Sequence, residues 1–190
     1  MKNTIKIRKS EDGSKSRIVE GTAIVFNSPS SPIGGEYIEY IMPQAVTEDL
    51  IKSSDIFCYL DHNKDRGVLA RSRYGEGSLS LSIEKDGLHY SFEAPHTQLG
   101  DELLNYIERG EICTSSFGFR LPLDGSGAEW SRNEKNELIC HVTKIAELTD
   151  VSPVFEPAYL ASDCHIRNKL ENIKKIDEKL DVIKNEFEFL

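Results

Sequence analysis

The chain has 190 residues, of which 38% are hydrophobic and 29% charged, a composition typical of a soluble globular protein and not of a disordered segment. Its formal net charge of -9 disfavours binding to nucleic acid, because contact with a phosphate backbone needs clustered Lys and Arg. No apolar run is long enough for a membrane span, and the first residues lack the apolar core of a signal peptide. We therefore expect a cytoplasmic protein with neither nucleic acid nor a membrane as partner.

The first quarter of the chain predicts strands followed by one helix. Ile5 and Ile7 alternate with lysines, and residues 17–26 are rich in β-branched side chains. Together the two segments indicate a hairpin. A short strand over 37–41 follows a Ser/Pro/Gly loop. Pro43 suits the first turn of a helix, which we expect to run to about residue 52.

The middle of the chain carries further strands and a second helix. Residues 56–60 form an apolar run of strand length, and residues 79–83 and 88–92 alternate around an Asp-Gly turn, the clearest hairpin in the sequence. Thr97 can cap a helix that Gly110 ends. We then expect a strand over 112–120, a polar loop over 124–136, and strands over 138–148 and 151–155.

These elements predict an α+β protein, mainly an antiparallel β-barrel with helices packed outside it, because closure removes exposed strand edges. We expect residues 1–166 to form one domain and residues 167–190 to form an amphipathic helical tail. The tail has a 3-4-3-4-3 apolar spacing at Ile173, Ile176, Leu180, Ile183, Phe187 and Leu190. This C-terminal helix either packs on its own domain or forms a short coiled coil with a partner or with a second copy, which would make a homo-oligomer.

The cysteines do not suggest a metal site or a disulfide framework. The four of them are scattered without a C-x-x-C pair, so free thiols are the expected state. Cys140 and His141 are neighbours that point to opposite faces of a strand and cannot easily share a metal ion. We expect no cofactor.

Three short segments carry residues that can perform chemistry. Asp61-His62 directly follows a predicted strand, where a loop histidine can reach a cleft. Residues 113–119, Cys-Thr-Ser-Ser-Phe-Gly-Phe, place small hydroxyl side chains before a glycine on a strand. Asp150 lies at a strand edge, where its carboxylate can orient a histidine. Taken singly, each segment is equally well explained as an ordinary loop or strand.

Together and in order, these segments resemble the phage prohead proteases of the HK97 type. The resemblance covers residues 18–161 and rests on an ordered set of motifs. These include Gly-Thr-Ala-Ile-Val-Phe at 21–26, Leu-Asp-His at 60–62, Ile-Glu-Arg-Gly-Glu-Ile at 107–112, Ser-Ser-Phe-Gly-Phe at 115–119 and Asp-Val-Ser-Pro-Val at 150–154.

The resemblance implies a serine endopeptidase with a fold like that of the herpesvirus assemblins, a β-barrel ringed by helices. It implies cleavage of the major capsid protein and its scaffold segment inside the procapsid in the bacterial cytoplasm, with self-cleavage. Carried over residue by residue, it assigns His62 as base, Ser116 as nucleophile and Asp150 as third member.

The third member departs from the family's pattern, which has glutamate where this chain has Asp150. Glu147 is one substitute, although three residues along a regular strand would turn it to the opposite face. His141 is another, because assemblins use a second histidine. There are two alternative functions. One is an inactive scaffolding or capsid-binding module of the same fold, and the other is a cysteine hydrolase that uses Cys113.

Overall fold

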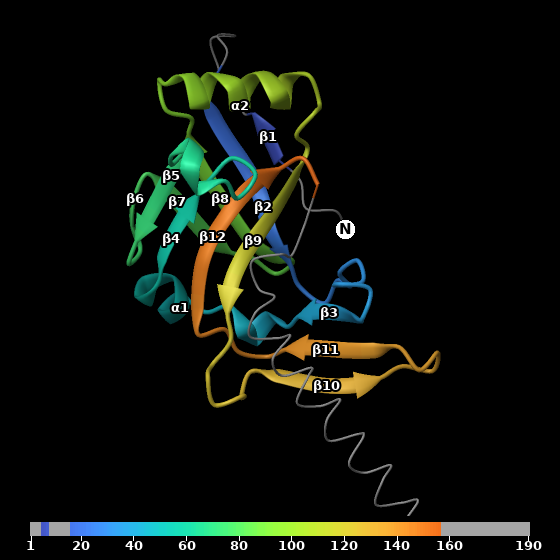
Figure 1. Cartoon of the computed structure of the whole chain (residues 1–190). Coiled ribbons are helices and arrows are strands. Elements are labelled where there is room, and N and C mark those ends of the chain that lie inside the picture. Colours follow the sequence, from blue (N-terminus) through green and yellow to red (C-terminus); the bar gives the residue numbers. More distant parts are fainter. Residues whose placement is uncertain (1–4, 8–15, 157–190) are drawn as a thin grey trace, which may run out of the picture.

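The computed structural model describes residues 5–7 and 16–156, and these are mostly β-structure, with three open sheets and two short α-helices (Figure 1). The predicted closed antiparallel barrel was wrong, since the described strands do not join into one ring. Alternating side chains reveal where strands are, but closure depends on strand number and stagger, which no local pattern contains.

The first sheet is a four-stranded antiparallel sheet in the order β1-β2-β8-β7. It confirms both predicted hairpin pairings, β1 with β2 and β7 with β8. Its strands are β1 (Ile5–Ile7), β2 (Ile18–Val25), β7 (Leu79–Ile83) and β8 (Gly87–Glu93).

The second sheet has five strands in the order β6-β5-β4-β12-β9. Strand β12 is an inner strand of this sheet, side by side with β9 in antiparallel pairing and with β4 in parallel pairing. The strands are β4 (Asp55–Cys58), β5 (Ala70–Arg73), β6 (Glu76–Gly77), β9 (Thr114–Arg120) and β12 (Glu147–Val154). Strands β5 and β6 were not predicted from the sequence, and Glu147 and Leu148 were predicted to belong to the preceding strand.

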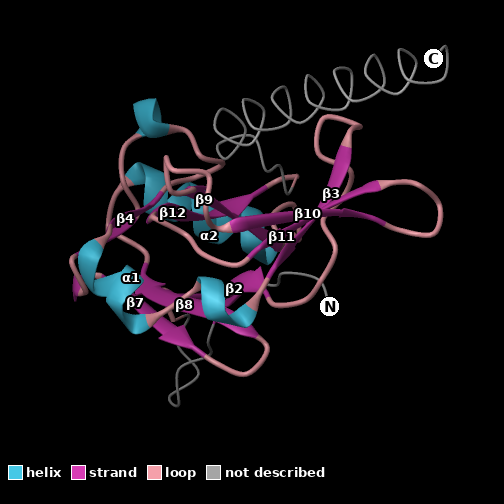
Figure 2. Cartoon of the chain, turned by 90° about the horizontal axis from the view of Figure 1, so that it is seen from below, coloured by secondary structure: helices cyan, strands magenta, loops and turns pink. Residues whose placement is uncertain are grey.

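These two sheets pack face to face, and Figure 2 shows β4, β12 and β9 in one layer and β7, β8 and β2 in the other. Buried apolar side chains of both layers form one core between them, including Val19, Ile24, Leu88, Ile56, Phe117 and Val151. Tyr90 of β8 lies across Gly21 of β2, where a Cβ atom would come within 2.6 Å of the tyrosine ring. Any larger residue at this position of β2 would therefore displace the Tyr90 ring.

The third sheet has three strands in the order β10-β11-β3 and lies beside the other two (Figure 1). Its strands are β3 (Tyr37–Ile41), β10 (Ala128–Arg132) and β11 (Leu138–Val142), with β3 and β11 parallel. The polar loop predicted around Trp130 was wrong, because this residue lies in β10, where its ring contacts Tyr37 edge-on at 5.2 Å. The alternation in β10 is too weak to mark a strand.

The first predicted helix is shorter than expected, whereas the second has the predicted ends. Residues 43–52 divide into a 3-10 turn, η1 (Pro43–Ala45), and helix α1 (Glu48–Ser53), which Thr47 caps by accepting a hydrogen bond from the Leu50 amide. Helix α2 (Gln98–Glu108) begins after the predicted cap Thr97 and is followed by Gly110 with a φ of 74°. A second 3-10 turn, η2 (Lys64–Arg66), follows β4.

The predicted helical tail over 167–190 lies outside the described residues, and so does the homo-oligomer predicted through it. Within the part of the chain that the structure describes, no helix has the length and apolar content needed to cross a lipid bilayer.

Candidate active site

The turn after β4 carries His62 and has an unusual backbone. Asp61 and His62 are consecutive non-glycine residues in the left-handed region, with φ of 56° and 53°. Such residues persist only where surrounding contacts hold them, and they concentrate at functional sites. Here β12 holds the turn, because the Asp61 amide donates to the Pro153 carbonyl oxygen at 2.9 Å. Because β4 pairs with β12 in parallel, the turn that follows β4 places His62 beside β12.

His62 contacts Asp150 directly. Its Nδ1 lies 2.5 Å from Oδ1 of Asp150, whose side chain is 6% exposed. A proton on Nδ1 that is donated to this carboxylate leaves Nε2 as the basic nitrogen. Nε2 is buried and has no hydrogen-bond partner among the described residues. The histidine is therefore oriented by an acid and has a base nitrogen available, as a catalytic imidazole requires.

Ser116 lies on the same face of the second sheet as Asp150. In the register of β9 and β12, Ser116 is opposite Ser152 and Gly118 is opposite Asp150. Opposite residues in an antiparallel pair share a face, and so do residues two apart on one strand. Gly118, the residue of β9 directly opposite Asp150, has no side chain. The structure thus brings His62, Ser116 and Asp150 to one face of β9 and β12.

Ser115 points the other way, into the core between the two sheets. Its Oγ lies 2.8 Å from the hydroxyl of Tyr90, and both residues are buried. Burial is the main cause that raises the pKa of the Tyr90 phenol, so this group stays neutral. Ser115 is accordingly a structural hydrogen-bonding residue.

The two substitutes for Asp150 lie elsewhere. A register shift between Leu148 and Asp150 leaves Thr149 unpaired, so Glu147 pairs with Arg120 and shares the face of Asp150. The prediction that Glu147 lies on the opposite face was therefore wrong, but its carboxylate is bound by the Arg120 guanidinium at the exposed end of the strand. His141 lies in β11 of the third sheet, stacked on Tyr40.

The polar contacts behind the Asp150 carboxylate were not predicted from the sequence. The Ser152 hydroxyl donates to Oδ1 of Asp150 at 2.7 Å and accepts a hydrogen bond from the Tyr59 amide at 3.2 Å. Ser152 is two residues from Asp150 on a strand, so strand periodicity alone places both on one face. That signal was present in the Asp-Val-Ser motif.

The charge of Asp150 also acts on its neighbours. Burial is the main cause that raises the pKa of the Cys58 thiol, and the negative charge of Asp150 raises this pKa further. Cys58 is therefore a neutral thiol and a poor nucleophile. Cys113, the predicted nucleophile of the alternative cysteine hydrolase, is exposed and precedes β9.

Arg71 and Arg120, two cations that could help to form an oxyanion hole, are both bound to carboxylates. The Nε of Arg71 donates to Oδ1 of Asp55 at 2.7 Å, and its guanidinium lies 4.4 Å from the centre of the Phe57 ring. Arg120 is bound to Glu147.

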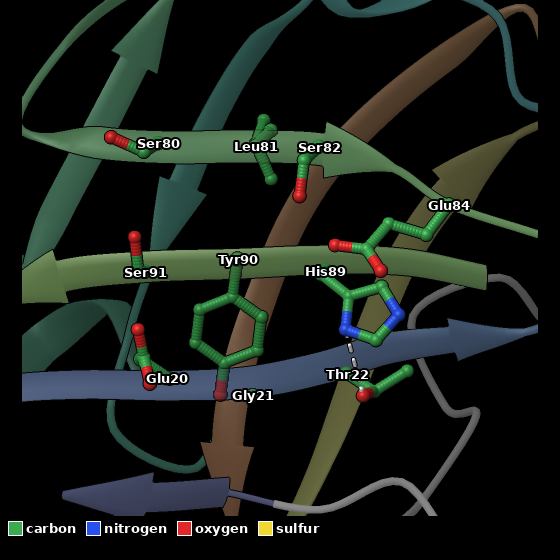
Figure 3. Close-up of a pocket in the computed structure, with 10 residues that line it drawn as sticks. All are labelled: Glu20, Gly21, Thr22, Ser80, Leu81, Ser82, Glu84, His89, Tyr90 and Ser91. Atoms are coloured by element: carbon green, nitrogen blue, oxygen red, sulfur yellow. Dashed lines mark hydrogen bonds between the residues drawn. The ribbon is translucent and has the colours of Figure 1, made fainter. Parts of the chain in front are cut away.

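A hollow of about 620 Å³ lies away from this site, on the outer side of β2, β7 and β8 (Figure 3). Its lining is mainly hydroxyl and carboxylate groups, from residues that include Glu20, Thr22, Ser80, Ser82, Glu84 and Ser91. Donor atoms of Glu84, Asp86 and His89 lie within 4.8 Å of one another at its edge. Both ring nitrogens of His89 have protein partners, Thr22 and Asp86, so protein contacts account for this cluster.

A family model described as caudovirus prohead serine protease matches residues 3–176. Curated proteins gave no match, and neither did solved structures.

Proposed function

Since the chain belongs to the caudovirus prohead serine protease family, we propose that it is an endopeptidase that cleaves capsid and scaffold proteins during head maturation, and that it also cleaves itself. The observation that carries the proposal is the hydrogen bond between His62 and the buried Asp150, on the sheet face that also carries Ser116.

In the proposed mechanism, Ser116 attacks the scissile carbonyl carbon while Nε2 of His62 takes its proton. The same proton then goes to the leaving amine, and water repeats the cycle to release the acyl group. Asp150 holds the tautomer with the proton on Nδ1 and stabilises the imidazolium without being protonated. A chain order of histidine, serine and acid is acceptable, because a triad is defined by geometry.

The contact between Ser116 and His62 has to form during binding. Nε2 of His62 has no partner among the described residues, so the serine hydroxyl does not bond to it in this state. Catalytic hydrogen bonds are often long or absent without substrate and tighten in the complex. We propose that the peptide substrate brings the two groups together.

The test is incubation of the purified chain with its own capsid protein, followed by mass spectrometry of new termini. We expect defined cuts with the wild-type chain and none with Ser116→Ala. Self-cleavage predicts that the wild-type chain shortens after expression, whereas Ser116→Ala keeps its full mass. Binding to capsid protein without any cut by the wild-type chain would instead favour an inactive capsid-binding module.

A further inference from the structure

We propose that Ser152 is a positioning residue that aims the Asp150 carboxylate at His62; this inference deepens the proposed function and rests on it. Ser152 is fully buried on β12, and its hydroxyl lies 2.7 Å from Oδ1 of Asp150. Oδ1 is the same oxygen that His62 contacts at 2.5 Å. Two donors therefore converge on one carboxylate oxygen.

The direction of the Ser152 hydroxyl is set by the backbone of a neighbouring strand. The Tyr59 amide, just after β4, donates to the serine oxygen at 3.2 Å. A hydroxyl has one hydrogen, and an amide donor occupies its lone-pair side, so its own hydrogen is free to point at Asp150. A chain of three hydrogen bonds thus runs from the Tyr59 amide through Ser152 and Asp150 to His62.

The carboxylate has no equivalent support elsewhere in the described residues. Gly118, its partner on β9, has no side chain. The hydroxyl of Thr149 reaches the other oxygen, Oδ2, at the longer distance of 3.4 Å. A buried carboxylate needs donors to stay charged and to keep one orientation. Ser152 supplies the short hydrogen bond to Asp150 that does not involve the histidine.

The test compares Ser152→Ala with Ser54→Ala. Ser54 is also a buried serine. Its hydroxyl oxygen accepts a hydrogen bond from the Leu148 amide of β12, at the same distance of 3.2 Å. Both variants remove a buried hydroxyl that accepts a hydrogen bond from one backbone amide, but only Ser152→Ala removes a hydrogen-bond donor to Asp150. Thermal unfolding establishes that each variant folds.

Two measurements separate positioning from simple structural support. Peptide hydrolysis is expected to show kcat about tenfold lower in Ser152→Ala with KM unchanged, since a hydrogen bond to a charged group is worth about this factor. Proton NMR is expected to show the low-field signal of the proton between His62 and Asp150 shifted or broadened. This spectrum is recorded in Ser116→Ala protein, so that self-cleavage does not consume the sample.

The outcomes distinguish this inference from the proposed function. Unchanged kcat and an unchanged low-field signal in Ser152→Ala overturn the positioning role, as does an equal loss of kcat in Ser54→Ala. A signal that responds only to Ser152→Ala supports positioning even if the wild-type chain cuts no peptide, a result that would overturn the protease instead. If Ser152→Ala does not fold, Ser152→Cys, with a weak S–H donor of similar size, is expected to show the same changes.

Discussion

Ser115 and Ser116 are consecutive residues of β9, yet their side chains lie on opposite faces of the sheet. Ser115 bonds to the buried Tyr90 in the core, whereas Ser116 faces Ser152 and the side of β12 that carries Asp150. One position along the strand therefore separates a residue that stabilises the fold from the proposed nucleophile.

Substitutions on the two sides of β9 should have opposite consequences. We expect Ser116→Ala to lower turnover by a factor on the order of a million, with little change in the free energy of unfolding. Ser115→Ala leaves the Tyr90 hydroxyl unpaired, so it should cost about 1–3 kcal/mol of stability while turnover persists. Urea unfolding and peptide hydrolysis measure the two effects. Loss of turnover in Ser115→Ala at temperatures where it stays folded would contradict the assignment.

His62 should be essential, and asparagine is the informative replacement. Asparagine adopts left-handed backbone more readily than most residues, so His62→Asn removes the base without imposing a worse fit at a φ of 53°. We expect peptide hydrolysis to disappear while the circular dichroism spectrum is unchanged. Matched variants His89→Asn and His96→Asn should retain wild-type rates, because their rings lie at other carboxylates. Wild-type activity in His62→Asn would remove the base from the mechanism.

Asp150→Asn should lower turnover strongly, by up to about ten-thousand-fold, because the amide favours the wrong imidazole tautomer. The effect is measured as kcat for one peptide substrate in parallel with Glu147→Gln and His141→Ala. Both controls are expected to have near wild-type kcat, since Glu147 binds Arg120 and His141 lies in the third sheet. A large loss confined to either control would transfer the role of third member to that residue.

The ion pair between Asp55 and Arg71 should make stability depend on pH in the acid range. The hydrogen bond from Arg71 lowers the pKa of Asp55 below its ordinary value of 3.8. A lowered folded-state pKa stabilises the protein above the unfolded value, and this contribution is lost as pH falls from about 3.8 through the lower folded-state pKa.

Asp55→Asn should therefore flatten the decrease of unfolding free energy as the pH falls below 3.8. Urea unfolding at several pH values compares it with the wild-type chain and with Glu76→Gln, an exposed carboxylate on the neighbouring β6. The same slope in Asp55→Asn as in the wild-type chain would show that this pair does not contribute.

Local patterns in the sequence were sufficient for several elements. Alternating side chains around an Asp-Gly turn predicted the β7–β8 hairpin, and a capping threonine with a terminal glycine predicted α2. The ordered motifs predicted the family, which the family model confirmed. Each of these signals lies within a few consecutive residues or in their order along the chain, so it can be read without knowing which segments meet.

The relations between distant segments required the tertiary structure. Parallel pairing places β4 beside β12 and brings His62 to Asp150, 88 residues away in sequence. The register shift at Thr149 places Glu147 on the same sheet face as Asp150. The Tyr59 amide orients the hydroxyl of Ser152 by a hydrogen bond. The sequence by itself predicted which residues could carry the chemistry, whereas the tertiary structure decided which of them meet. The physical reason is that strand pairing, register and sheet closure depend on contacts between segments far apart in the chain, and no local spacing records them.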